Sequence, residues 1–577
     1  MKTLQRWNKR NPLLNNKTGV HGRGQAHLLH NETGAIRKTW GRIGKSRGIT
    51  PVALIFPNTY AVGMSNLGLQ TLYATLNAQQ HIAAERFFYH EGSPWKSEES
   101  GRPLNDFQIL LFSVSFEADY PNVIRAISAC GLSPLAADRE NEKGPLVLAG
   151  GVATFINPEP LAPFIDAFLL GEFEAISPDF LPILKDLADT QTNRKTRLEL
   201  LAGNCHCVYV PNRFSTAITP ARQIHPMETV PHTRIISGDA AFSNMFLLEL
   251  ARGCGKGCRF CAAGFVYRPA RPWPQEALLS TLNDIKGTDK IGLVGLEFLQ
   301  REDINHICEN LLNRGMRLAF SSMRIDNLTD AFIEVLIKSH ITTATIAPEA
   351  GSERMRAIIN KNLTEETILA GIERLATAGI LNFKLYFMYG LPFETPEDME
   401  ALVGLIKLAK KIITPIGQKQ KHLGNITVSA GTFVPKAWTP FQWSDFIDEK
   451  THTIHRNILI KGLSSLANVR LRLDSWRSAS IQAILSRGDR TLAPILQDVA
   501  LNATPWRKAF KNCKDKGPNA PTAASFLKGR DIHETLPWEA VQHSITKAFL
   551  QQEWAKAKKA KNSPSCMPGC RRCGVCN

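Results

Sequence analysis

The stretch Gly253-Cys-Gly-Lys-Gly-Cys-Arg-Phe-Cys261 places three cysteines at C-x3-C-x2-C spacing. In one short loop, the thiolates of Cys254, Cys258 and Cys261 can bind three irons of a cubane [4Fe–4S] cluster and leave the fourth iron open. A cluster held only by structural cysteines normally takes four of them, so the spacing indicates an iron that binds a substrate or cofactor. Zinc is the alternative, because clustered cysteines also bind that metal.

The sequence around this loop predicts a series of β/α units between residues 241 and 445. Short apolar segments typical of strands lie at 246–249, 291–298, 317–321, 343–347, 383–389 and 426–433. Six such units, separated by helical patterns, fit a partial (β/α)6 barrel, a fold that binds its ligands at the carboxyl ends of its strands. The cysteine loop follows the first of these strands.

A second β/α series precedes the barrel, over residues 49–199. Strand patterns at 52–56, 107–113, 145–149 and 165–171 alternate with helical segments. This alternation predicts a parallel, doubly wound, Rossmann-like sheet. We expect residues 200–240, with several Pro and Thr, to link the two domains, and residues 446–561 to be mainly amphipathic helix.

With these features the chain resembles the radical S-adenosylmethionine (SAM) superfamily, in which an aromatic residue, here Phe260, precedes the last cysteine. The partial barrel is typical of this superfamily. The resemblance implies an enzyme in which SAM chelates the open iron and is cleaved reductively to a 5′-deoxyadenosyl radical. The cofactor would supply the reactivity, while the protein excludes water and holds the substrate roughly 3–3.5 Å from the reacting atom.

The resemblance also implies SAM-binding positions at the ends of the barrel strands. Gly295-Leu-Glu297 stands where a Gly-Gly-Glu motif usually holds the methionine amino group, with Leu296 in place of a glycine. Arg324 could pair with the SAM carboxylate, or equally with a neighbouring acid. The full set of expected SAM positions is Phe260, Gly295, Glu297, Ser322, Arg324 and Glu349.

The first domain resembles the cobalamin-binding domains that precede many radical SAM cores. Those domains carry a D-x-H-x-x-G loop whose His ligates cobalt, whereas Asn58-Thr-Tyr-Ala-Val-Gly63 has Asn for Asp and Tyr for His. Three interpretations stay open: cobalamin bound without a protein imidazole, a domain used for substrate or partner binding, or a generic doubly wound domain. The candidate cobalamin positions are Tyr60, Gly63, Ser113, Ser115, Gly150 and Gly151.

Residues 562–577 form a second cysteine-rich segment with C-x3-C-x2-C-x2-C spacing. Its four thiols, Cys566, Cys570, Cys573 and Cys576, are enough for a closed metal site. Zinc would suit a structural site, but the spacing resembles ferredoxin-type runs, so we favour an auxiliary [4Fe–4S] cluster. The remaining pair, Cys205 and Cys207, is expected to be buried and structural.

Composition limits the remaining choices. The chain has 577 residues, a net charge of +17 and twelve cysteines, and it lacks an apolar run near eighteen residues. It therefore reads as a multidomain, cytoplasmic protein with no membrane span, whose cysteines serve metal or redox chemistry. Residues 1–48 contain eleven Lys and Arg but a single acid, so this basic arm, like the basic C-terminal segment, could track a phosphate backbone or be a solvated tail.

Blocks in every domain are similar to an uncharacterised bacterial group of radical SAM proteins with a cobalamin-binding-like N-terminal domain and a Cys-rich tail. The blocks lie at 57–65, 157–160, 433–443 and 485–489. Our leading hypothesis is an enzyme that modifies RNA by methylation, alkylation or sulfur insertion, with a reductant such as flavodoxin or ferredoxin. The alternative is a cobalamin-assisted methyltransferase or other transferase that acts on a lipid, a small metabolite or a peptide.

Overall fold

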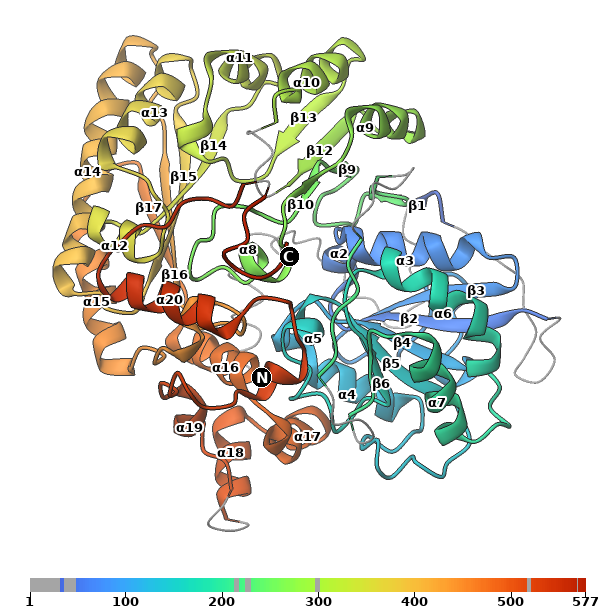
Figure 1. Ribbon diagram of the computed structural model, residues 1–577. Helices are drawn as coiled ribbons and strands as arrows, with labels where there is room; N and C mark the ends of the chain where they lie inside the picture. The colour runs from blue at the N-terminus through green and yellow to red at the C-terminus, as the bar shows by residue number, and fades with distance from the viewer. Residues whose placement is uncertain are drawn as a thin grey trace.

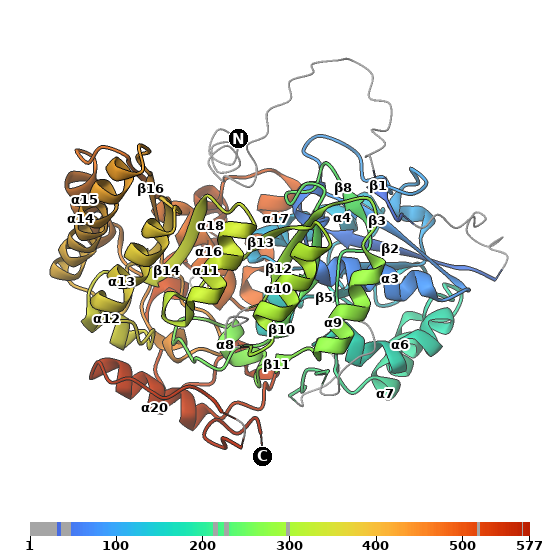
Figure 2. The same cartoon turned by 90° about the horizontal axis from the view of Figure 1, so that it is seen from above.

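The computed structural model contains two groups of mainly parallel strands that lie side by side in the molecule (Figures 1 and 2). It describes residues 32–35, 48–211, 217–223, 230–295, 301–515, 520–567 and 569–576. Most of the basic arm expected over residues 1–48 lies outside the described residues, as does Glu297. Within the described part of the chain, no helix is both long and apolar enough to cross a membrane.

The first sheet has the strand order β3-β2-β4-β5-β6-β7, in which only β7 runs antiparallel to its neighbour. Its strands are β2 (Thr50–Phe56), β3 (Ile82–Phe88), β4 (Ile109–Ser113), β5 (Leu146–Gly150), β6 (Ala167–Leu169) and β7 (Val208–Tyr209). The order of the first five is that of a flavodoxin-type doubly wound sheet, whose ligand-binding switch point lies here between β2 and β4. The predicted doubly wound fold is confirmed.

Side chains of this sheet alternate between two hydrophobic cores. Leu54 packs on the face covered by α3 and α6, whereas Ile55 packs on the face covered by α4, α5 and three C-terminal helices. Arg125 ties the second face together, because it donates hydrogen bonds to the carbonyl oxygens of Val499 and Ala500 at 3.1 and 3.0 Å. The helices concerned are α3 (Leu67–Ala78), α4 (Tyr120–Ala129), α5 (Val152–Ile156), α6 (Phe173–Leu187), α16 (Trp476–Arg487), α17 (Ala493–Leu501) and α18 (Trp506–Lys514).

The sequence pattern does not predict β3, because Glu85 and Arg86 interrupt its apolar run. Both residues are nevertheless buried in the structure. Arg86 forms ion pairs with Glu32 at 2.7 Å and with Glu99 at 2.6 Å, which compensate for the loss of water around its charge. Partners this distant along the chain leave no local signal.

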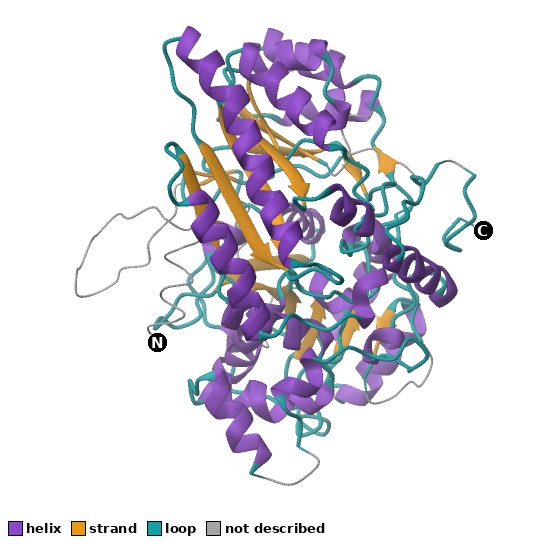
Figure 3. Ribbon diagram, turned by 90° about the vertical axis from the view of Figure 1, so that its left-hand side faces the viewer, coloured by secondary structure: helices purple, strands orange, loops and turns teal. Residues whose placement is uncertain are grey.

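The second group of strands forms a partial barrel in two sheets. The orders are β13-β12-β9 and β14-β15-β16-β17, all pairs are parallel, and a bridge between Met323 and Ile346 joins the two sheets. The strands are β9 (Phe246–Glu249), β12 (Lys290–Val294), β13 (Arg317–Phe320), β14 (Thr343–Glu349), β15 (Asn382–Tyr389), β16 (Ile426–Thr432) and β17 (Val469–Leu473). Helices cover one face of these strands (Figure 3).

The helices on that face follow the strands in turn, as the β/α pattern predicts. They are α9 (Gln275–Thr281), α10 (Ile304–Asn313), α11 (Asp330–Lys338), α13 (Glu365–Thr377), α14 (Pro396–Lys419) and α15 (Glu449–Leu463). Their apolar side chains form one core with those of the strands.

Two expectations need correction. Strand β17 lies in the segment 446–561, which we expected to be mainly helical. Its sequence signal is weak, because Val469, Leu471 and Leu473 alternate with arginines over only five residues. Residues 200–240 also do more than link two domains: β7 adds an edge strand to the first sheet, and β8 (Ile236–Ser237) pairs with β1 (Glu32–Thr33). Cys205 and Cys207 are buried as expected and lie just before β7.

The turn after β5 depends on the missing side chain of Gly151. Its φ of +101° is unfavourable for other residues, and a Cβ there would lie 2.5 Å from the carbonyl oxygen of Val114. We expect Gly151→Ala to lower the free energy of unfolding by more than about 1 kcal/mol, measured by urea denaturation without added cofactor. Gly203→Ala is the control, because Gly203 lies in α7 (Arg194–Asn204) with no atom within 4 Å of a Cβ. Equal stability of the two variants would refute the close approach.

Candidate functional site

The cysteine loop leaves the barrel at the carboxyl end of its first strand. After β9, the short strand β10 (Ala251–Arg252) pairs with β11 (Arg271–Pro272), so residues 253–270 return to their starting point. Gly253 closes this return, since its φ is +81° and a Cβ would lie 2.3 Å from the carbonyl oxygen of Tyr267. The loop and the helix that follows, α8 (Ala263–Val266), therefore lie where the partial barrel is expected to bind ligands.

Cys254, Cys258 and Cys261 are partly exposed on this loop, and none of the twelve cysteines of the chain is in a disulfide. Burial and the neighbouring Cys258 raise the pKa of Cys261 to about 11, so a bound metal would displace a proton from its thiol. Among the described residues, no group of three His, Cys, Asp or Glu side chains is already spaced to hold a metal ion. The donor set fits an iron–sulfur cluster by its chemistry, and its assembly would draw the three thiols together.

A buried arginine inside the motif holds the loop to the rest of the protein. The side chain of Arg259 is fully buried, and its Nε and Nη2 lie 3.1 Å from Oε2 of Glu553 on α20 (Lys547–Lys558). The same guanidinium donates to the carbonyl oxygens of Ala357, Ile358 and Lys561 at 3.0, 2.8 and 2.7 Å. One side chain thus connects the cysteine loop, the end of α12 (Glu353–Ile358) and the C-terminal helix.

The C-terminal tail also contacts the loop directly (Figure 1). Asn360 donates from its side-chain amide to the carbonyl oxygens of Lys256 and Gly257 at 3.2 and 3.1 Å, and accepts a hydrogen bond from the backbone N–H of Ser563 at 2.7 Å. The backbone N–H of Cys566 donates to the carbonyl oxygen of Gly255 at 2.6 Å. The two cysteine clusters, far apart in sequence, are therefore in hydrogen-bond contact.

Within the tail, the four cysteines differ in their surroundings. Cys573 is buried and Cys576 is exposed, while the other two are intermediate. Hydrogen bonds from the backbone and side chain of Arg572, whose Nε lies 3.2 Å from the sulfur, lower the pKa of Cys570 to about 7. A thiol that ionises near neutral pH is a ready metal ligand.

The structure brings together two of the expected SAM positions at the ends of β13 and β14. Glu349 follows a bulge in β14, has a φ of +71°, and lies 3.2 Å from the Nζ of Lys361. Burial raises the pKa of Glu349, and the charges of Lys361 and Arg324 oppose this rise. Arg324 itself pairs with Asp326 at 2.8 Å and donates to the carbonyl oxygen of Lys361 at 3.0 Å, so the neighbouring acid considered above is its partner here.

The other expected SAM positions are arranged around this pair. Phe260 and Met388 pack against the same buried apolar cluster, and Ser322 is exposed just beyond β13. Gly295 follows β12, and its carbonyl oxygen accepts a hydrogen bond from Ser321 at 3.3 Å. The sequence does not single out Lys361, Asn360 or Glu553, because nothing in their local sequence distinguishes them from ordinary surface residues.

The expected cobalamin positions lie at the carboxyl edge of the first sheet. Tyr60 does not point to an open site: its buried hydroxyl donates to Glu32 at 2.6 Å and contacts Ser237 at 2.9 Å, and burial raises its pKa. Ser115 accepts a hydrogen bond from Asn66 at 3.2 Å. Ser113 and Gly150 end neighbouring strands, and Gly63 packs against Phe88, as a Cβ there would lie 2.3 Å from that ring.

Unpaired polar atoms are found beside these positions, at the switch point between β2 and β4. Within the described residues, Oγ1 of Thr59, Oδ2 of Asp119 and the hydroxyl of Tyr120 are buried without a hydrogen-bond partner. Burial raises the pKa of Asp119 to about 8. Lys436, from the loop after β16, reaches this edge and pairs with Glu117. The switch point therefore faces the barrel and carries buried polar groups that a ligand could satisfy.

A network of ion pairs fixes the barrel entrance to the first domain. Arg252, directly before the cysteine loop, lies 3.1 Å from Glu172, 2.8 Å from Glu174 and 2.8 Å from Glu249. Arg271 adds a second bond to Glu172 at 2.6 Å. Glu172 and Glu174 lie at the start of α6, just after strand β6 of the first sheet. The ion pairs therefore tie β10 and β11, the two strands at the base of the cysteine loop, to that end of the first sheet.

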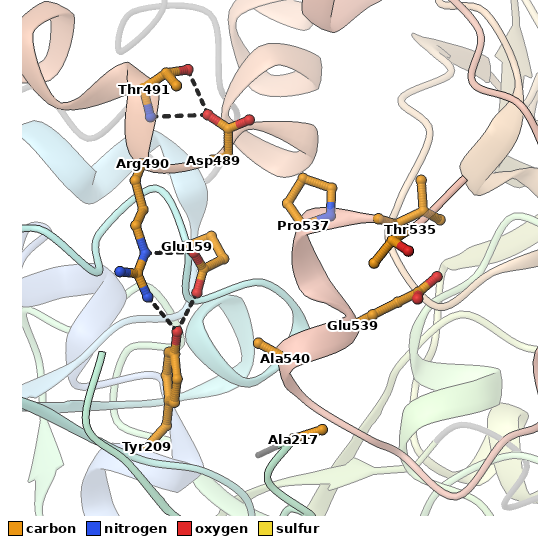
Figure 4. Close-up of a pocket in the computed structure, with 11 residues that line it drawn as sticks. Glu159, Tyr209, Ala217, Asp489, Arg490, Thr491, Thr535, Pro537, Glu539 and Ala540 are labelled. Carbon is orange, nitrogen blue, oxygen red and sulfur yellow. Dashed lines mark hydrogen bonds and ion pairs between the residues drawn. The ribbon is translucent and has the colours of Figure 1, made fainter. Parts of the chain in front are cut away.

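A pocket of about 670 Å³ lies elsewhere, between the first domain and the C-terminal helices. The guanidinium of Arg490 lies 2.7 Å from Glu159 and 2.6 Å from the hydroxyl of Tyr209, and Tyr209 donates to Glu159 at 2.5 Å. Figure 4 shows these three side chains together at one side of the pocket. These polar groups satisfy one another. None of the expected cofactor positions is among the residues that line this pocket, so we do not place the reaction there.

Comparison with known proteins finds matches to both domains. Residues 248–406 match the radical SAM superfamily, and residues 68–211 match the family of N-terminal regions of radical SAM proteins. An uncharacterized protein of Methanocaldococcus jannaschii, MJ0966, is 28% identical over 469 residues, which are 80% of this chain and 94% of the relative.

Two similar solved structures are of TsrM, a radical SAM methyltransferase from Kitasatospora setae, and both are 13% identical to this chain. One, with cobalamin and a [4Fe–4S] cluster bound, has a TM-score of 0.47 and covers 80% of this chain and 98% of its own. The other, with tryptophan and a SAM analogue bound, has a TM-score of 0.44 and covers 68% of this chain and 74% of its own.

The buried pair that holds the cysteine loop can be tested with Glu553→Gln. The variant leaves the charge of Arg259 buried without a counter-ion, so the free energy of unfolding should fall by about 3 kcal/mol at pH 7. Hydrogen exchange should also quicken in residues 253–261. Glu539→Gln is the control, because its ion pair with Lys547 is about one-third exposed and should contribute less than about 1 kcal/mol.

The same variant has an expected pH dependence. Burial opposes ionisation of Glu553, but hydrogen bonds from Lys556 and Ser563 and the charge of Arg259 outweigh it, so the pKa is lowered. The stability difference from wild type should therefore be complete above about pH 4.3 and disappear as the pH falls through the lowered pKa. A difference that persists in stronger acid would contradict the role of this charge.

Proposed function

This chain belongs to the radical SAM superfamily, and on that premise we propose that it modifies RNA by transferring a methyl, alkyl or sulfur group. Cys254, Cys258 and Cys261 would hold the [4Fe–4S] cluster, while Glu349 and Arg324, with the other positions named above, would hold SAM. When bound, this pair of cofactors supplies a carbon radical at the cost of one electron. That electron would come from a reductant such as flavodoxin or ferredoxin.

The observation that carries the RNA proposal is a basic and aromatic surface beside the cysteine loop. Lys558, Lys559 and Lys561 are exposed at the end of α20, the helix that binds Arg259 of the loop. The Nζ of Lys558 lies 5.5 Å from the ring centroid of Trp554, and that ring lies 5.3 Å from Phe393, which is 39% exposed. Lysines that neutralise phosphates next to aromatic rings on which bases stack are the usual means of binding single-stranded RNA.

A second function is favoured by the first domain. Its switch point carries three buried polar atoms that have no hydrogen-bond partner among the described residues: Oγ1 of Thr59, Oδ2 of Asp119 and the hydroxyl of Tyr120. Lys436 of the barrel reaches the same edge. This arrangement supports cobalamin between the two domains, held without a bond from Tyr60, whose hydroxyl is already engaged. The protein would then be a cobalamin-assisted transferase, which could act on a lipid, a small metabolite or a peptide as well as on RNA.

The cofactors can be counted after anaerobic reconstitution with iron, sulfide and hydroxocobalamin followed by desalting. Two [4Fe–4S] clusters predict about eight irons per chain, and the variant Cys254/Cys258/Cys261→Ala should keep about four in the tail. A variant that retains zinc alone would make the tail a zinc site. Cobalamin should remain visible in the absorption spectrum of both proteins, and its repeated loss from both would remove the second function.

RNA binding should show the signature of phosphate contacts. The affinity for total tRNA should fall linearly with salt on logarithmic axes, and Lys558/Lys559/Lys561→Gln should reduce the slope by about 2, or roughly 0.7 for each lost contact with a single strand. The control variant, Lys338/Lys407/Lys411→Gln, removes three exposed lysines from α11 and α14 on the outside of the barrel and should change the slope little.

The modification itself is tested by mass spectrometry of tRNA and rRNA nucleosides from deletion and wild-type cells. We expect one modified nucleoside to disappear in the deletion strain and to return with the wild-type gene. Unchanged nucleosides together with a changed lipid or metabolite profile would overturn the RNA proposal in favour of the second function.

A further inference from the structure

The face of the β14–β17 sheet opposite to the helices is polar. Phe383, Leu385 and Phe387 of β15 pack in the core beneath the helices, so the alternating residues Lys384 and Tyr386 point to the other side. Both are exposed although β15 lies inside the sheet, and Tyr386 is 41% exposed. The face of the β14–β17 sheet that lies opposite to the helices is therefore not covered at β15.

The register of the strands arranges this inner face in layers. In one layer the neighbours across the sheet are Thr345, Lys384, Thr427 and Arg470. In the next layer toward the carboxyl ends they are Tyr386, Ser429 and Arg472. Met388 and Gly431 form the layer after that. Glu349, at the end of β14, pairs with Phe387, one residue before Met388. Hydroxyl groups and cations thus line the sheet below the expected SAM position.

The three cations of this face are unpaired. Lys384, Arg470 and Arg472 are exposed, and within the part of the chain that the structure describes none of them forms a hydrogen bond or an ion pair. This contrasts with Arg252, Arg259 and Arg324 around the cysteine loop, each of which has an acidic partner. Like charges on one face repel each other, and an anion bound between them would remove that cost.

Acidic groups on this face are few and lie toward its carboxyl edge. Glu349 is paired with Lys361. Asp474 follows β17, and its Oδ2 would lie 3.1 Å from a Cβ on Gly431. Because two residues of a strand span about 7 Å, Arg472 lies roughly one such step behind the Met388 layer, and Lys384 and Arg470 lie roughly two. The cations are therefore gathered at the end of this face that lies away from the cysteine loop.

We propose that this inner face binds phosphate of the substrate through Lys384, Arg470 and Arg472 and so presents the reacting atom to SAM at the mouth of the barrel. Arginine side chains bind phosphate with two parallel hydrogen bonds, and the hydroxyls of Tyr386, Thr427 and Ser429 add uncharged donors beside them. Three cations suit a group with several charged oxygens better than one carboxylate. The phosphate belongs either to an RNA backbone, in which case the site rests on the proposed function, or to a small phosphorylated metabolite.

The test uses tripolyphosphate as the probe and the full chain as the protein. Isothermal titration should show binding by wild type and at least about tenfold weaker binding by Lys384/Arg470/Arg472→Gln. The control Lys338/Lys407/Lys411→Gln carries the same change in net charge on the outer helices and should bind within about twofold of wild type. All three target side chains are exposed and repel one another, so the melting temperature of the variant without ligand should not fall below that of wild type.

Arg470/Arg472→Lys provides a further check on the same site. It keeps the charge but loses the paired hydrogen bonds of the guanidinium, so its affinity should lie between those of wild type and the triple variant. Tripolyphosphate bound equally well by wild type and the triple variant would overturn the proposal.

A second titration, with total tRNA, separates the two sources of phosphate. If the triple variant loses affinity for both tRNA and tripolyphosphate, the site holds the RNA backbone. If it loses affinity for tripolyphosphate alone, the site stands with a small phosphorylated metabolite as substrate. The nucleoside profile of deletion cells is independent of either titration, so a failure of the RNA proposal is distinguishable from a failure of this site.

Discussion

The hydrogen-bonded ion pair between Arg259 and Glu553 is the interaction on which the arrangement of the site depends. Three thiols on a loop rich in glycine have little structure of their own, and the loop must be held by groups outside it. The guanidinium of Arg259 does this from within the motif, since it binds a carboxylate of the C-terminal helix and three backbone carbonyls from two other segments. Because the pair is buried, losing either partner would leave a charge without water or counter-ion.

The ion pair between Arg259 and Glu553 explains why the last residues of the chain belong to the site. The helix that carries Glu553 leads into Ser563 and Cys566, which hydrogen-bond to Asn360 and to the cysteine loop. The start of the cysteine-rich tail, at Cys566, is therefore held against Gly255 of the cysteine loop. The exposed lysines of the same helix are brought to the mouth of the barrel by the same contacts, so the basic surface and the radical chemistry share one anchor.

The ion pairs of Arg252 and Arg271 hold the two domains together, as Arg259 holds the cysteine loop in place. They join the start of α6 in the first domain to the two short strands at the base of the cysteine loop. As a result the carboxyl edge of the first sheet, where a doubly wound fold binds its ligand, is turned toward the barrel. Lys436 makes the reverse connection, from the barrel to Glu117 at the switch point. A cofactor at that edge would lie between the two domains.

Most of the strands and helices, and the chemical type of the site, follow from local sequence patterns. Alternating apolar segments predict the six barrel strands and most of the first sheet, and the spacing of Cys254, Cys258 and Cys261 predicts an iron–sulfur loop, because both signals are local. Strands β3 and β17 were not predicted, because charged residues interrupt or shorten their apolar patterns. Arg86 can be buried in β3 only because it forms ion pairs with Glu32 and Glu99, which lie elsewhere in the sequence. Tertiary structure alone decided that Glu553, Asn360 and Cys566 meet the loop, that Tyr60 is engaged by Glu32, and that Lys384, Arg470 and Arg472 share one face. These are contacts between residues far apart along the chain, and strand register, burial and charge compensation create them only when the whole chain is folded.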